Sequence, residues 1–184
     1  MMARKAIERC RGRTRHGHPG RVARLALTDA SPSIGLAIVD GLPWLQALFG
    51  KVWLPIQVRD QVLRRPVARG QAAVQAGLDA GWLAEWQGAS AHMHLPHLDE
   101  GQAACIRIAL AQGEQALLLI GERAGRAAAL EDGIRVAGAA TVIGMARQRG
   151  WIPLARAAFA TLHSSDFRIS ANVIRAVLAR VGEA

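Results

Sequence analysis

The chain alternates between short apolar runs and longer stretches closed by glycine, proline or capping residues. Short apolar runs bounded by turn residues predict β-strands, and the longer stretches predict helices. The predicted strands are residues 22–28, 51–54, 82–87, 116–120 and 134–136. The predicted helices are residues 33–40, 43–49, 56–65, 71–80, 99–111, 122–131, 139–149, 153–162 and 170–181. Strands and helices therefore alternate over most of the chain.

This alternation predicts an α/β fold in which helices cover both faces of a central, mostly parallel sheet. The uninterrupted apolar run at 116–120 is short enough to be a central strand of that sheet. The functional crevice of such a sheet lies beyond the carboxyl ends of its strands. Two strand ends can be named from the sequence, Thr28-Asp29 and Ile120-Gly121, and we expect the functional site there.

Positive charge is concentrated at the amino-terminal end of the chain. The 184 residues carry a formal charge of +9, and residues 1–24 contain eight lysines or arginines against the single acid Glu8. This segment has little apolar periodicity, so we expect a disordered basic tail followed by one folded domain over residues 25–182. The tail is interpreted either as an arm that binds phosphates or as a solvated extension without a specific partner.

Composition excludes several classes of protein. A hydrophobic content of 51% excludes a wholly disordered chain. The longest apolar runs are too short to span a bilayer, and no hydrophobic segment follows the amino-terminal charges as it would in a secretory signal. The two cysteines, Cys10 and Cys105, form no metal or redox motif. We therefore expect a soluble cytoplasmic protein that has no membrane partner.

A set of short motifs follows one after another along the chain with regular spacing. They are Asp29-Ala30-Ser31-Pro32, Val52-Trp53-Leu54-Pro55, Leu98-Asp99-Glu100-Gly101, Leu118-Leu119-Ile120 with Arg123-Ala124-Gly125-Arg126, Gly150-Trp151-Ile152 and Phe167-Arg168-Ile169-Ser170. No single motif is specific, but the ordered set over residues 25–180 resembles a PIN-like family of unknown function. Members of that family are similar to VapC-type ribonuclease toxins and are often paired with small antitoxin-like proteins. The resemblance implies a PIN-like three-layer α/β/α fold.

The resemblance also implies a metal-dependent endoribonuclease whose carboxylates gather at the carboxyl ends of the strands. Carboxylates suit Mg²⁺ or Mn²⁺, which are hard cations that prefer oxygen ligands, and the metal activates a water against the scissile phosphate. Carried over one by one, the acidic positions of the family fall on Asp29, Gln61, Gln102, Ala104, Gly121 and Glu122. Asp29 and Glu122 are therefore the expected catalytic residues, and Asp29, Asp99 and Glu122 the expected metal ligands.

The substitutions at the acidic positions leave two functions open. The first is a metal-dependent endoribonuclease toxin of a type II toxin–antitoxin system with a degenerate acidic site, in which Mg²⁺ or Mn²⁺ binds weakly. The second is a non-catalytic PIN-like module that binds RNA or an antitoxin-like partner. The expected partners in both cases are RNA and a small antitoxin-like protein, and a homodimer also stays open.

Three further signals have an ordinary structural interpretation. His92, His94 and His97 fall in a predicted loop at a spacing typical of no known metal site, which favours a polar loop. The five tryptophans could stack on bases, but their positions at element junctions favour packing. A DNA-binding role for the predicted helices between residues 139 and 181 is disfavoured because their arginines are scattered rather than gathered on one face.

Overall fold

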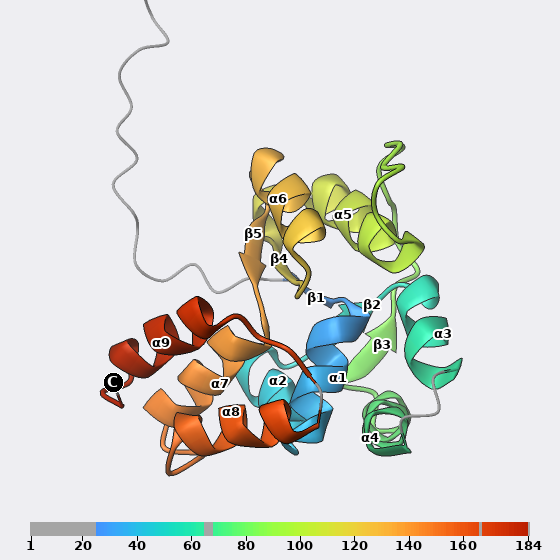
Figure 1. The fold of residues 1–184 in the computed structure, drawn as a ribbon. Helices are drawn as coiled ribbons and strands as arrows, with labels where there is room; N and C mark the ends of the chain where they lie inside the picture. The colour runs from blue at the N-terminus through green and yellow to red at the C-terminus, as the bar shows by residue number, and fades with distance from the viewer. Residues whose placement is uncertain (1–24, 65–67, 166, 184) are drawn as a thin grey trace, which may run out of the picture.

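The structure, a computed structural model, describes residues 25–64, 68–165 and 167–183 (Figure 1). Its centre is a five-stranded sheet in the order β3-β2-β1-β4-β5. The strands are β1 (Leu25–Thr28), β2 (Val52–Leu54), β3 (Leu83–Glu85), β4 (Ala116–Leu119) and β5 (Arg135–Ala137). Every neighbouring pair is parallel, so the expected mostly parallel sheet is confirmed and is parallel throughout. The predicted basic tail, residues 1–24, lies outside the described residues.

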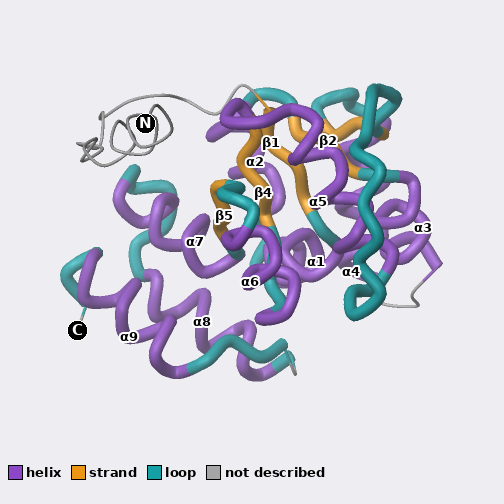
Figure 2. Tube along the Cα trace, turned by 90° about the horizontal axis from the view of Figure 1, so that it is seen from above, coloured by secondary structure: helices purple, strands orange, loops and turns teal. Residues whose placement is uncertain are grey.

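Helices cover both faces of this sheet. They are α1 (Ala30–Ile38), α2 (Leu42–Phe49), α3 (Ile56–Arg64), α4 (Ala68–Asp79), α5 (Glu100–Gln112), α6 (Arg123–Glu131), α7 (Ala139–Gln148), α8 (Ala155–Ser164) and α9 (Ala171–Arg180), with a 3₁₀ turn η1 (Gly113–Gln115). Because crossovers between parallel strands are right-handed, α5 and α6 lie on one face, and α1 and α2 on the other, where α7 joins them (Figure 1). Viewed from above, α7, α8 and α9 gather on the β5 side and α3 and α4 on the other side (Figure 2). The fold is a three-layer α/β/α arrangement, as expected.

The two central strands end level with each other. Strand β1 pairs with β4 in a register that places Thr28 opposite Leu119. The ladder continues one residue beyond β1, because the backbone N–H of Asp29 donates to the carbonyl of Leu119 at 2.9 Å. Residues on both strands are buried, as the apolar runs predicted. The carboxyl ends of β1 and β4 therefore meet at one edge of the sheet, which is where the functional site is expected.

Two helices begin earlier than the sequence indicated. The motif from Asp29 to Pro32 was expected to be a turn before a helix at residue 33, but α1 already begins at Ala30. Asp29 is the extended residue that precedes the helix, with φ −82° and ψ 168°. Pro32 fits the first turn because an N–H at that position has no partner within the helix. Helix α4 likewise begins at Ala68 rather than at residue 71.

The carboxyl-terminal helices are tied together by Glu183. Its carboxylate accepts hydrogen bonds from the backbone N–H groups of Ala155 and Arg156, both at 2.9 Å, and from Nε of Arg147 at 2.8 Å. It therefore caps the start of α8, supplying acceptors for N–H groups that have none within the helix. A single side chain after α9 thus connects α7, α8 and α9.

None of the described helices is by itself both long enough and apolar enough to cross a membrane. Helices α1 and α2 meet these requirements only as a pair, and they are bent relative to each other by 114°.

Candidate functional site

Asp29 lies at the end of the central strand, between β1 and α1. It is 3% exposed, and its backbone is fixed on both sides. Its N–H donates to Leu119, and its carbonyl accepts from the hydroxyls of Thr28 and Ser33 at 3.1 and 3.0 Å. Its side chain makes no capping hydrogen bond to α1. The fixed backbone therefore holds the carboxyl group of Asp29 at the start of α1.

The electrostatic surroundings of Asp29 include two other carboxylates. Burial, together with the negative charges of Asp99 and Glu122, raises the pKa of Asp29 to about 6, although hydrogen bonding to the backbone N–H groups of Ala30 and Ser31 opposes the shift. Asp99 is the capping residue before α5, and Glu122 is the capping residue before α6. The expected site residues therefore come from three separate elements and are close enough to influence one another.

Gln61 contacts Asp99 through its side chain, whereas Gln102 contacts it only through its backbone. The Oδ1 atom of Asp99 accepts a hydrogen bond from the backbone N–H of Gln102 at 3.0 Å and one from Nε2 of Gln61 at 3.3 Å. The side chain of Gln102 is 2% exposed and lies against Gly125 of α6. Both glutamines stand where the resemblance implies acids, and both contact Asp99 or lie near it. Each can offer an amide oxygen, but neither offers charge.

A glycine allows Gln61 to approach α5 this closely. A Cβ atom at Gly101 would lie 2.5 Å from Oε1 of Gln61, which is closer than two such atoms can come. The neighbouring acid Asp60 faces another way, since its carboxylate pairs with Arg59 at 2.9 Å and with Arg64 at 3.2 Å. Asp60 therefore does not replace the acid missing at position 61, as the spacing of adjacent helix positions indicates.

Gly121 lies two residues after the end of β4, beside Ser31 in the first turn of α1. Its φ is not positive, so its backbone would accept another residue without conformational strain. A Cβ atom there would lie 2.6 Å from Oγ of Ser31, so any side chain at this position requires the serine to move. The exposed Glu122 follows and makes no capping hydrogen bond to α6. The strand end at which the resemblance implies an acid therefore carries a small residue packed against Ser31.

These residues fit a divalent cation poorly. Within the part of the chain that the structure describes, no group of three histidine, cysteine, aspartate or glutamate side chains is arranged to hold a metal ion. Asp29 is buried with a raised pKa, and Asp99 already accepts two hydrogen bonds. Ala104, another acidic position in the family, is buried and apolar. Ligation of Mg²⁺ or Mn²⁺ by Asp29, Asp99 and Glu122 stays a prediction.

The remaining candidate side chains are the histidines before α5 and the tryptophans. His92, His94 and His97 are exposed in the segment before α5. The rings of Trp53 and Trp86 pack edge to face with centroids 5.4 Å apart, which agrees with a packing role. A cavity of about 530 Å³ lies beside Ser31 and Gly121 and was not predicted from the sequence. The arginine motif at the start of α6 was its only local signal, because its other walls come from distant parts of the chain.

Comparison with known proteins gives a family but no individual relative. A search of curated proteins and a search of solved structures both found no match for this chain. The sequence profile of the family described as a PIN domain matches residues 25–183, which covers the whole sheet and all the described helices. The parallel sheet, with Asp29 at the end of its central strand, agrees with that match. The chain therefore belongs to the PIN domain family.

Proposed function

We propose that this chain is a nuclease-type PIN domain with a degenerate acidic site, which binds single-stranded RNA and hydrolyses it weakly or not at all. The observation that carries the proposal is the set of neutral residues at the carboxyl edge of the sheet. Gln61 donates to Asp99, the buried side chain of Gln102 lies against Gly125, and Gly121 lies against Ser31, at positions where the resemblance implies acids. The resemblance to VapC-type ribonuclease toxins implies RNA as the substrate class. The neutral residues at the sheet edge are the reason to expect low activity.

The loss of charge acts directly on metal binding. Mg²⁺ is strongly hydrated, and its affinity for a protein site rises with the number of charged oxygens that the site offers. Each glutamine replaces one such charge with a neutral amide. Asp29, with a pKa of about 6, also holds its negative charge less firmly than an ordinary aspartate does near neutral pH. Low metal occupancy, and so little activation of water, follows from these residues.

An active endoribonuclease toxin is the second candidate. It is favoured by the charges of Asp99 and Glu122 that act on Asp29, since three neighbouring carboxyls could still attract a divalent cation. In either case we propose a cytoplasmic protein paired with a small antitoxin-like partner. Co-expression with a small protein encoded beside it, followed by size-exclusion chromatography, tests the partner, and separate elution of the two proteins contradicts this part of the proposal.

Cleavage and binding assays separate the two candidates. The purified chain and its Asp29→Asn variant are incubated with labelled single-stranded RNA in Mg²⁺ or Mn²⁺, and RNA binding is measured separately in EDTA. We expect both proteins to bind RNA and to cleave it at similar, near-background rates. Metal-dependent cleavage that Asp29→Asn abolishes would establish the active toxin instead. Absence of RNA binding would remove the proposed substrate class.

A further inference from the structure

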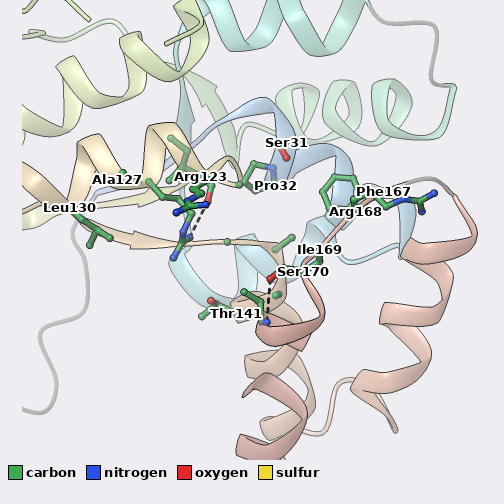
Figure 3. Close-up of a pocket in the computed structure, with 17 residues that line it drawn as sticks. Ser31, Pro32, Arg123, Ala127, Leu130, Thr141, Phe167, Arg168, Ile169 and Ser170 are labelled. Carbon is green, nitrogen blue, oxygen red and sulfur yellow. Dashed lines mark hydrogen bonds between the residues drawn. The ribbon is translucent and has the colours of Figure 1, made fainter. Parts of the chain in front are cut away.

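A cavity of about 530 Å³ opens at the carboxyl edge of the sheet, next to the acidic site (Figure 3). It lies between α6, the first turn of α7 and the segment that leads from Phe167 into α9. Ser31 and Gly121, which also contact each other, form the wall shared with the acidic site. Its volume is within the range of about 300–1,000 Å³ that is typical of small-molecule sites.

Two arginines of α6 make one wall of the cavity positive. Arg126 donates from Nη1 to the backbone carbonyl of Ile120 at 3.2 Å, which fixes its guanidinium at the end of β4. Arg123 is one turn earlier on the same helix and is exposed. Arg168 also lines the cavity, but its Nη1 donates to the carbonyl of His163. None of the described lining residues is acidic, so this wall favours an anion.

The first turn of α7 adds hydrogen-bond donors to the same wall. Ala139 and Ala140 line the cavity, and their N–H groups come before the first backbone hydrogen bond of the helix, from Thr141 to Gly138 at 3.0 Å. Gly138, in the capping position, has no side chain that could accept from them. The positive end of the helix dipole lies at this turn. Guanidinium and backbone donors together suit the oxygens of a phosphate.

The remaining wall is apolar and partly uncovered. The ring of Phe167 lies on Gly35, where a Cβ atom would come within 2.6 Å of it, so α1 fixes the position of the ring. Leu130 is 57% exposed and Val173 is 45% exposed, and both line the cavity. A flat ring system could stack on the ring of Phe167, as bases do on aromatic side chains.

We propose that this cavity binds a nucleoside monophosphate, either free or as the phosphorylated end of an RNA strand. The phosphate lies against Arg123, Arg126 and the first turn of α7, and the base lies against the ring of Phe167. For an RNA strand, the inference rests on the proposed function, and the cavity is then a subsite for the terminal nucleotide of the bound RNA. Binding of a free nucleotide does not depend on that function and needs no metal.

Calorimetric titrations in EDTA test the site with the full chain. The probes are the ribonucleoside 5′-monophosphates, the matching nucleosides, inorganic phosphate, and a short RNA with a 5′ phosphate or a 5′ hydroxyl. We expect a monophosphate to bind more tightly than its nucleoside or inorganic phosphate, and the phosphorylated RNA to compete with it. Equal binding of the nucleoside would overturn the assignment of the phosphate wall. Equal binding of inorganic phosphate would reduce the site to a simple anion site and overturn the role of the base.

Two variants and one control locate the binding. Arg123→Gln removes one exposed charge and is expected to weaken monophosphate binding by about tenfold, which is typical of a charge-assisted hydrogen bond. Phe167→Leu is expected to weaken it by removing the aromatic ring on which the base stacks. Arg180→Gln is the matched control, because Arg180 is exposed at the far end of α9 and does not line the cavity. If the two cavity variants behave like the control, the site is wrongly assigned.

RNA binding by the same variants distinguishes this inference from the proposed function. If the chain binds RNA and neither cavity variant changes that affinity or the affinity for nucleotides, the inference fails and the proposed function stands. If no RNA binds but monophosphates bind in an Arg123-dependent way, the inference stands for free nucleotides and the proposed function fails. If neither ligand binds, both are overturned.

Discussion

The side chain of Asp29 is almost completely buried. Its pKa of about 6 means that the folded protein holds the protonated form more tightly than the unfolded chain, whose ordinary value is 3.8. The stabilisation from this proton is therefore fully present below pH 3.8 and is lost as pH rises through about 6. Above that range the buried charge destabilises the metal-free fold.

Asp29→Asn removes this titration and is expected to stabilise the metal-free protein at pH 8, by on the order of 2 kcal/mol. The amide keeps the shape of the side chain and carries no charge. Urea unfolding in EDTA at pH 4.5 and pH 8 measures the effect, and the difference between variant and parent should shrink at the lower pH. A difference that is the same at both pH values contradicts a raised pKa at Asp29.

Gln61 donates to Asp99, so the change Gln61→Glu places a second carboxylate beside the first. In metal-free buffer at pH 7 we expect it to lower the free energy of unfolding by about 1 kcal/mol, because two like charges meet at a partly exposed site. Adding Mg²⁺ should restore part of that loss, since a cation between the carboxylates is bound only by the folded protein. Urea unfolding with and without Mg²⁺ is the measurement.

Gln75→Glu is the matched control for this change. Gln75 also donates to an aspartate, Asp79, at 2.8 Å, but on the surface of α4 and away from the sheet edge. The new glutamate repels Asp79 in the same way, but α4 contains none of the acidic-site residues Asp29, Asp99 and Glu122. If Mg²⁺ restores the stability of both variants equally, the effect is general screening and not a metal site at Asp99.

At the scale of the elements, the sequence predicted the strands and helices in their correct order. Short apolar runs such as the one that became β4 are local signals and need no knowledge of the fold. The start of α1 was missed because its entry is set by a distant contact. Asp29 stays extended since its N–H pairs with Leu119 of β4, and nothing in the motif from Asp29 to Pro32 shows this partner.

The candidate site was only partly predicted, because several of its contacts also join residues that are far apart in the sequence. The motifs located Asp29, Asp99 and Glu122 at element ends, and the structure places them where their charges interact. The contact of Gln61 with Asp99 depends on how α3 packs against α5, and that of Gly121 with Ser31 on how β4 pairs with β1. The cavity beside them has walls from four helices, so it could not be found from any one segment.

The stability of the carboxyl-terminal helices is expected to depend on the hydrogen bonds that Glu183 accepts. Hydrogen bonds from the backbone N–H groups of Arg156 and Ala155, together with Arg147, hold the pKa of Glu183 below its usual value. Its stabilising contribution is therefore present above the ordinary glutamate pKa and is lost as pH falls through the lowered value. Glu183→Gln should lower the thermal midpoint at pH 7, because one acceptor oxygen becomes a donor facing donors.

The thermal midpoint of Glu183→Gln is best compared with that of Glu131→Gln. Glu131 is the exposed last residue of α6, and the same change there alters the net charge equally. Circular dichroism melts at pH 7 and pH 3.5 give the comparison, and the difference between the Glu183 variant and the parent should narrow at the lower pH. Equal midpoints for both variants at pH 7 would mean that Glu183 does not hold α8 in place.

At the scale of the whole molecule, the acidic site is assembled from β1, β4, α3 and α5, so its charge can be restored only at several places at once. Gly121→Asp, Gln61→Glu and Gln102→Glu each supply a carboxylate where the family has an acid. Ser31→Ala is added because Oγ of Ser31 lies 2.6 Å from the position of the new Cβ at residue 121. Gln102 is buried, so its carboxylate is expected to be tolerated only when the metal is bound.

We expect the fourfold variant to bind Mn²⁺ or Mg²⁺ at least tenfold more tightly than the parent, because metal affinity rises with the charge of the ligands. Metal-dependent RNA cleavage should rise from background with it, and Asp29→Asn in the same variant should abolish the gain. Calorimetry with Mn²⁺ and cleavage of labelled RNA are the two measurements, after circular dichroism has shown a folded protein. The variant with Ser31→Ala alone is the control for the removed hydroxyl. A folded variant that binds the metal tightly and leaves RNA intact, where an active PIN nuclease cleaves it, would show that the missing acids are not what limits this chain.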